Sequence, residues 1–116
     1  LGHDLESPLK QCIDNNWAFS LASDFNPNCR SLSIPFVGSL ATHRLGLSPI
    51  EALVAVTRNP ATTLLNSTDG RLSGSIREGG PADLLILDSE YIDAWCQMPG
   101  DNPIYKTIKS GKVVNS

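Results

Sequence analysis

The sequence predicts an α/β fold, and three observations support that class. A short apolar segment, residues 17–23, lies between two stretches whose apolar residues recur at helical spacing. A second apolar run, Leu84–Leu87, is bounded by Asp83 and Asp88, as expected for a strand covered on both faces. The predicted loops between helix and strand are short, which is typical of βαβ units.

The composition bounds the class of protein. The chain has 116 residues, of which 41% are hydrophobic and 18% charged, enough for one globular domain with a modest core. The net charge is −3 and no long basic run occurs, which argues against a nucleic-acid or anionic membrane surface. The three cysteines show neither metal-site nor disulfide spacing, so a reducing, cytoplasmic compartment is predicted. Residues 1–4 lack a secretory pattern and do not begin with Met, so we expect an internal start.

The first helix is predicted to begin at Ser7-Pro8, because Ser is a preferred N-cap and Pro fits the first helical position. Asn15-Asn16 predicts its end, and the strand over residues 17–23 follows directly. A second helix is predicted over residues 35–46, closed by a glycine that suits a helix C-terminus.

Two further helices are predicted from their starts. Ser48-Pro49-Ile50-Glu51 has the pattern of a capping box, and Asn59-Pro60 resembles a cap followed by proline. The composition then changes near residue 70 to a connection rich in glycine, serine and charge. In the second half, Ser110-Gly111 is a two-residue hairpin signal between two apolar runs. We therefore predict a boundary at residue 70, with a small β element after it.

Asp24 is the strongest candidate for chemistry, because it directly follows the predicted strand. In an α/β barrel, a carboxylate at the carboxyl end of a strand points to the mouth where active sites lie. It could ligate a metal or take a proton from metal-bound water. Asp24-Phe25-Asn26-Pro27 is also the composition of an ordinary turn, as in Asp101-Asn102-Pro103 of the same chain.

The other polar candidates are weaker. Asn26 and Asn28 could bind a polar substrate through their amides, or serve only the turn through local hydrogen bonds. Cys29 has no identifiable cationic partner that would make it a nucleophile. His3 and His43 do not supply the roughly three ligands of a catalytic zinc or iron site. His43 lies on a helical apolar stripe, so we expect it to be half-buried and structural.

Several segments spread over most of the chain carry a resemblance to a known family. They are Ala22-Ser23-Asp24-Phe25-Asn26-Pro27-Asn28, Ser33-Ile34-Pro35 and residues 47–53, 57–61, 74–88 and 107–114. Together they resemble the imidazolonepropionases of the amidohydrolase superfamily. The first segment is similar to that family's strand-eight signature, and the last two identify only the superfamily.

The resemblance implies the C-terminal fragment of a TIM (β/α)8 barrel plus the C-terminal strands of a small composite β-sandwich. Residues 1–70 would be the last βα part of the barrel, with strand eight at about 17–23, and residues 71–116 would belong to the sandwich. The implied reaction opens the ring of imidazolone propionate with water, giving N-formimidoyl-glutamate in histidine degradation. The implied metal is zinc or iron. Asp24 would be metal ligand and proton acceptor, and Asn26 would hold the substrate or product; Asn28 stands where many members have Gly.

The family's metal histidines have no counterpart in the sequence, and one carboxylate does not hold a catalytic metal. We therefore expect a chain that carries only the C-terminal part of the site and is inactive alone, with a small-molecule substrate and no nucleic-acid or membrane partner. Two alternatives stay open. One is a non-catalytic interaction module whose apolar faces are covered by oligomerisation, for instance in a homodimer. The other is an amidohydrolase of another cyclic amide or amidine.

Overall fold

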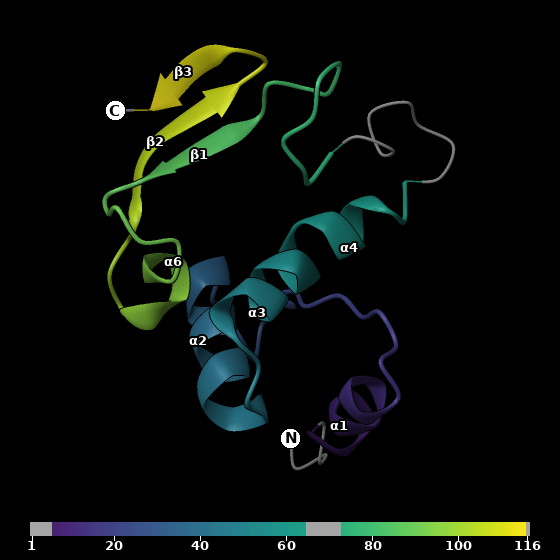
Figure 1. Cartoon of the computed structure of the whole chain (residues 1–116). Helices are drawn as coiled ribbons and strands as arrows, with labels where there is room; N and C mark the ends of the chain where they lie inside the picture. Colours follow the sequence, from purple (N-terminus) through teal and green to yellow (C-terminus); the bar gives the residue numbers. More distant parts are fainter. Residues whose placement is uncertain (1–5, 65–72, 116) are drawn as a thin grey trace.

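The computed structural model of the chain describes residues 6–64 and 73–115. The helices gather at one end of the molecule and an antiparallel sheet forms the other end (Figure 1). The elements in chain order are α1 (Glu6–Asp14), α2 (Ile34–Leu45), α3 (Pro49–Val56), α4 (Arg58–Ala61), β1 (Leu84–Leu87), α6 (Ala94–Gln97), β2 (Ile104–Lys109) and β3 (Lys112–Asn115). The α/β class is confirmed. The predicted boundary at residue 70 falls outside the described residues and stays a prediction.

Local capping starts the two central helices. The cap at Ser48 was predicted, whereas α2 was expected from residue 35 and begins at Ile34, after a cap at Ser33. The Ser33 hydroxyl accepts the Phe36 N–H at 3.2 Å at the start of α2. The Ser48 hydroxyl accepts the Glu51 N–H at 3.2 Å and donates to its carboxylate at 3.2 Å, which stabilises the first turn of α3. Gly46 ends α2 with φ 72°, a left-handed conformation that glycine adopts without steric cost.

Two further predicted helix starts were wrong. Helix α1 begins at Glu6, one residue before the predicted cap at Ser7. Helix α4 begins at Arg58, so Asn59 lies inside the helix rather than at its cap. The side chain of Asn59 instead donates to a distant carbonyl, that of Phe19, at 2.7 Å. The Asn59 side chain, which the local pattern assigned to a helix cap, therefore makes a tertiary hydrogen bond instead.

The core lies where α2 packs against α3 and α6. Its buried side chains are Ala41, Leu47, Ala52, Trp95 and Cys96, of which three are small. The indole N–H of Trp95 donates to the Pro49 carbonyl at 2.9 Å, because a buried Trp nitrogen needs a partner. The buried Ser39 hydroxyl donates to the Cys96 carbonyl, which joins α2 to α6 across 57 residues of sequence. These contacts attach the second half of the chain to the helices.

The sheet has the order β1-β2-β3, with both pairs antiparallel. Leu84 faces Ile108 and Leu87 faces Ile104 in the register of β1 and β2. The hairpin predicted at Ser110-Gly111 is confirmed, and both turn residues have positive φ, 51° and 79°, as a tight two-residue hairpin turn requires.

The expectation that β1 is covered on both faces was wrong. Leu85 is 58% exposed and its neighbour Ile86 is 45% exposed. Successive residues of a strand point to opposite faces, so apolar side chains are exposed on both faces of β1. Among the helices of the described residues, none is long and apolar enough to cross a membrane.

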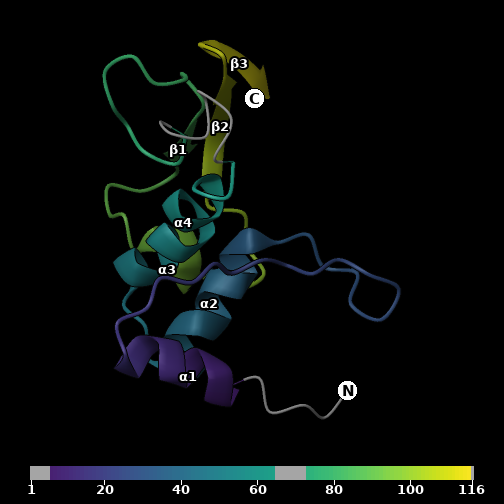
Figure 2. The ribbon, with the colours of Figure 1, turned by 90° about the vertical axis from the view of Figure 1, so that its right-hand side faces the viewer.

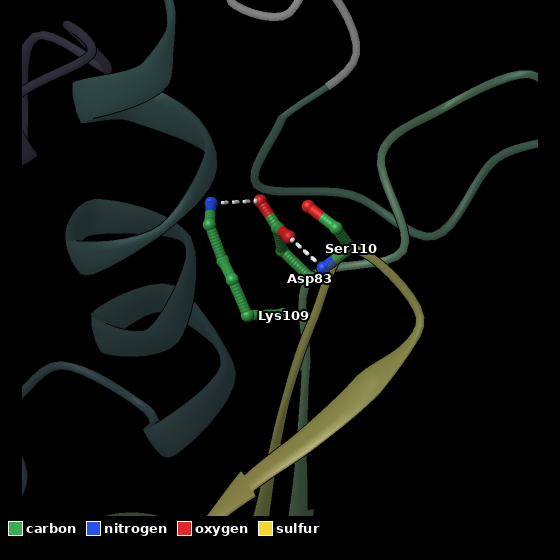
Figure 3. Close-up of polar contacts among 3 residues, drawn as sticks. All are labelled: Asp83, Lys109 and Ser110. Carbon is green, nitrogen blue, oxygen red and sulfur yellow. Dashed lines mark hydrogen bonds and ion pairs between the residues drawn. The ribbon is translucent and has the colours of Figure 1, made fainter.

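One carboxylate joins the start of β1 to the hairpin turn (Figure 3). Asp83 accepts the Lys109 ammonium at 2.7 Å and the Ser110 N–H at 2.9 Å. Beside it, the Gly111 N–H donates to the Ala82 carbonyl at 2.9 Å. The hydrogen bond from Lys109, followed by that from Ser110, lowers the pKa of Asp83 below its ordinary value. Both contacts stabilise the ionised carboxylate.

This geometry predicts how the turn depends on pH. The pKa of Asp83 is lower in the folded chain, so its contribution to stability is present above about pH 4, the ordinary range of an aspartate, and is lost as pH falls through the folded pKa. An NMR titration should therefore show the Ser110 amide shift changing below about pH 4. The Asp83→Asn variant is the control: a Ser110 transition that persists in it would contradict the assignment.

The chain exposes more surface than a compact monomer of its mass. Its accessible surface is 8516 Å², whereas a folded monomer of 12.5 kDa typically has about 6,200 Å². Large apolar side chains contribute to this surface. Exposed side chains include Trp17 at 60%, Leu32 at 72%, Ile76 at 90% and Val114 at 60%. A surface of this size and kind is typical of a protein part that packs against more polypeptide.

Candidate functional site

The segment before Asp24 is not the β-strand that the sequence predicts. Residues 17–25 form no β-ladder with any described residue. The side chains from Phe19 to Asp24 nevertheless alternate between partly buried and exposed, the period of an extended chain. A strand needs a neighbour for its N–H and C=O groups, and no described strand lies beside this segment. The chain runs past α2 as an irregular trace before it reaches the loop (Figure 2).

Two hydrogen bonds from the α3–α4 region hold this segment. The Leu21 N–H donates to the Ala55 carbonyl at 2.9 Å, and the Asn59 amide donates to the Phe19 carbonyl at 2.7 Å. Phe19 and Leu21 are also partly buried against the core. The helices therefore support the segment by one side of its backbone and by alternate side chains.

Residues 24–29 form a tight loop, and the chain here projects away from the helices (Figure 2). Asp24 is the first residue of this loop. Its φ is 49°, in the left-handed region that aspartate and asparagine enter more readily than other side chains. Two residues further on, Asn26 and Cys29 exchange both backbone hydrogen bonds at 3.0 Å and close a small bridge. The carboxylate of Asp24 is exposed at the edge of this loop.

The side chain of Asn26 organises the loop from inside. Its amide N–H donates to the Asp24 carbonyl at 2.6 Å, and its oxygen accepts the N–H groups of Asn28 at 2.8 Å and Cys29 at 3.2 Å. This is the local role that the sequence left open, since such bonds are typical of asparagine in turns. The side-chain oxygen of Asn26 is thereby occupied, and one of its amide N–H groups remains for a ligand. Asn28 is exposed.

The other candidates do not join this loop into a larger site. His43 lies on the exposed side of α2, so the half-buried role predicted for it was wrong. Phe36 and Leu40 on the same predicted stripe are 40% and 42% exposed, and only Leu47 at its end is buried in the core. His3 lies outside the described residues. Cys96 is buried, and burial raises the pKa of its thiol, so it is a poor nucleophile.

A metal site is not complete within residues 6–64 and 73–115. No group of three or more histidine, cysteine, aspartate or glutamate side chains lies together in this part of the chain. The exposed carboxylate of Asp24 could supply one oxygen ligand, but a stable catalytic metal needs about three protein ligands. The described residues taken alone therefore do not fit a bound zinc or iron ion.

A wide apolar hollow lies elsewhere, between the sheet and the helices. Its volume is about 1230 Å³, and Phe36, Leu53, Leu85 and Ile92 are among the residues that line it. Asp24, Asn26 and Asn28 are not part of its lining. The hollow is therefore separate from the loop in which the sequence places the chemistry.

Comparison with known proteins relates the whole chain to one group. A sequence model of the amidohydrolase family matches residues 2–115. A curated imidazolonepropionase of Haloarcula marismortui is 39% identical over 103 residues, 89% of this chain and 24% of the relative. Those of Porphyromonas gingivalis and Rubrobacter xylanophilus are 35% and 39% identical over 93% and 91% of this chain, and 25% of each relative. The chain thus spans about a quarter of the length of these relatives.

Proposed function

This chain belongs to the amidohydrolase family, and from that membership we propose that it is the C-terminal part of an imidazolonepropionase. One observation carries the proposal: relatives of that name are 35–39% identical over about nine-tenths of this chain. The proposed setting is the last part of a TIM barrel, with the sheet β1-β2-β3 as part of a small β-sandwich. The exposed apolar faces of that sheet are in keeping with further strands packing on it.

The proposed reaction is the hydrolysis of imidazolone propionate to N-formimidoyl-glutamate, a cytoplasmic step in histidine degradation. Water adds to the ring carbonyl carbon and the ring C–N bond breaks. The carbon becomes that of a carboxylate, one proton of the water passes to the ring nitrogen and the other is released. Asp24 is the proposed proton acceptor, because its carboxylate is exposed at a loop edge where a small polar molecule can reach it.

Asn26 and Asn28 are the proposed substrate contacts. Asn28 presents an exposed amide in the same loop as Asp24. Asn26 has one amide N–H left after its three loop contacts, and this group could donate to a substrate carboxylate. In this role Asn26 would both shape the loop and bind the substrate.

The proposed cofactor is zinc or iron, in line with the general use of metal ions in this family. A bound metal would lower the pKa of a coordinated water. Asp24 is proposed as one ligand, and the remaining ligands would have to come from outside the described residues. The 116-residue chain is accordingly expected to show no turnover by itself, even when supplied with either metal.

A chimera tests the role of Asp24. This chain would replace the matching segment of the Haloarcula marismortui relative, and formation of N-formimidoyl-glutamate would be measured. We expect turnover by the chimera, and a loss of about 10³-fold in kcat/KM on Asp24→Asn, the range typical of a lost general base. Asp101→Asn is the matched control, because it makes the same change in another turn that contains Asp, Asn and Pro, and it should leave turnover within about twofold. Full activity of the Asp24→Asn chimera would remove Asp24 from the site.

The excess of exposed surface favours a second candidate, a non-catalytic interaction module. In that case the purified chain should cover its apolar faces by self-association, as a homodimer in the simplest form. Light scattering during size-exclusion chromatography would report a folded dimer of defined mass. A folded monomer, or an aggregate without a thermal transition, would contradict this candidate.

A further inference from the structure

The support of residues 19–21 by the α3–α4 region leads to an inference about one residue. We infer that Asn59 is a positioning residue for the loop that carries Asp24. The inference rests on the proposed function only in so far as Asp24 takes part in the reaction. The contact itself is a property of this chain, since Asn59 donates to the Phe19 carbonyl at 2.7 Å from 40 residues away.

The geometry of an extended chain explains why the bond between Asn59 and Phe19 orients the segment that leads to the Asp24 loop. The N–H and C=O groups of residues i and i+2 point to the same side of an extended segment. The Phe19 carbonyl and the Leu21 N–H are such a pair, and their partners are the Asn59 amide and the Ala55 carbonyl. These two partners are four residues apart at the junction of α3 and α4. The junction therefore holds the segment at two consecutive points of one backbone edge.

The side chain of Asn59 does not cap helix α4, so no capping role competes with its hydrogen bond to the Phe19 carbonyl. Thr57 is the N-cap of α4 and makes no side-chain capping bond, while the Asn59 carbonyl accepts the Thr62 N–H at 3.2 Å, a bond over three residues at the C-terminal end of the helix. Asn59 is partly buried, so its bond to Phe19 is shielded from water more than a surface bond. Asparagine at this place is therefore explained by its tertiary partner.

The two anchored residues lie just before the loop. From Leu21 the chain reaches Asp24 in three residues, and from there the Asn26 side chain holds the loop together through its own bonds. The direction in which the segment leaves the helices thus determines where the Asp24 carboxylate is presented. Without the Asn59 bond, the loop would keep its internal structure but lose a fixed orientation relative to the helices.

Amide hydrogen exchange of the full 116-residue chain tests the inference. Asn59→Asp keeps the shape of the side chain but replaces the donor with a carboxylate facing the Phe19 carbonyl. The Leu21 amide should lose about tenfold in protection, and amide shifts of residues 22–26 should change. Asn15→Asp is the matched control, because Asn15 also donates through its amide, to the Gln11 carbonyl at 2.8 Å, but four residues away and at the surface. Unchanged Leu21 protection in the folded Asn59→Asp variant would overturn the inference.

A measurement on the unmodified chain covers the case in which the variant does not fold. The side-chain amide protons of Asn59 should exchange about tenfold more slowly than those of the exposed Asn28. Equal rates would overturn the inference. These results are separate from those of the proposed function: an inactive chimera would count against the hydrolase assignment and leave the exchange data as they are.

In the chimera, Asn59→Asp should lower kcat by about tenfold and also raise KM, because the loop that loses its orientation carries the proposed substrate contacts Asn26 and Asn28 as well as Asp24. The loss should be smaller than that of Asp24→Asn. A chimera in which Asn59→Asp affects only thermal stability, with kcat unchanged, would show a structural contact and no positioning role.

Discussion

The Gly38→Ala substitution is expected to lower the free energy of unfolding by about 2 kcal/mol. A Cβ at this position would lie 2.3 Å from Trp95 Cη2, 2.7 Å from Trp95 Cζ3 and 2.8 Å from Cys96 Cβ. Alanine in a helix interior is worth about 1 kcal/mol more than glycine, whereas overpacking costs up to about 3 kcal/mol. We expect the cost of overpacking to exceed the gain in helix propensity, because the Trp95 indole is held by its bond to the Pro49 carbonyl and cannot move away freely.

Urea unfolding followed by tryptophan fluorescence would measure this effect, with the m-value as a check on two-state behaviour. Trp95→Leu provides the companion variant, since it removes the ring atoms that the new methyl group meets. If the clash is the cause, Gly38→Ala should cost less in the Trp95→Leu background than alone. Equal costs in both backgrounds would rule out the indole as the source.

The Gly74→Ala substitution is expected to cost about 3 kcal/mol when two terms are added. Gly74 has φ 75°, so any L side chain there is strained by about 1 kcal/mol. A Cβ would also lie 2.5 Å from the Thr57 carbonyl oxygen and 2.8 Å from the Arg58 Cα. Both atoms belong to the backbone, and Arg58 also donates to the Ser73 carbonyl at 2.7 Å, so neither side can yield easily.

Gly79→Ala is the matched control for this prediction. Gly79 has almost the same φ, 79°, but an added Cβ would meet nothing within 4 Å. It should therefore show only the conformational cost of about 1 kcal/mol. Thermal melting of both variants separates the two terms; equal losses would mean that the close approach of Gly74 to the α3–α4 junction does not persist in solution.

The parts of the fold that depend on near neighbours were predictable. The caps at Ser33 and Ser48 and the hairpin at Ser110-Gly111 involve groups within three residues of one another. Their physical causes are the hydroxyl acceptor of a cap and the positive φ of a tight turn, and both can be read from residue types. The loop of Asp24 belongs to the same class, because its bonds span two or three residues.

The candidate site was predictable only as a list of residues. Asp24, Asn26 and Asn28 were recognised from a short pattern, and they do share one loop. Their support by Asn59 was missed, since the Asn59-Pro60 pair has the composition of a helix cap and the true partner lies 40 residues earlier. The strand before Asp24 was expected from its apolar residues, but a strand also requires a neighbouring backbone that no described residue supplies.

Residue types alone thus account for the helix starts of α2 and α3, the hairpin and the internal bonds of the Asp24 loop, because each depends on groups a few residues apart. Three contacts became evident only in the three-dimensional structure. They are the packing of Trp95 against Gly38, the close approach of Gly74 to Thr57, and the hydrogen bond from Asn59 to the Phe19 carbonyl. Each of these joins segments distant in sequence, and such contacts depend on how whole elements pack. No local propensity or spacing encodes that arrangement.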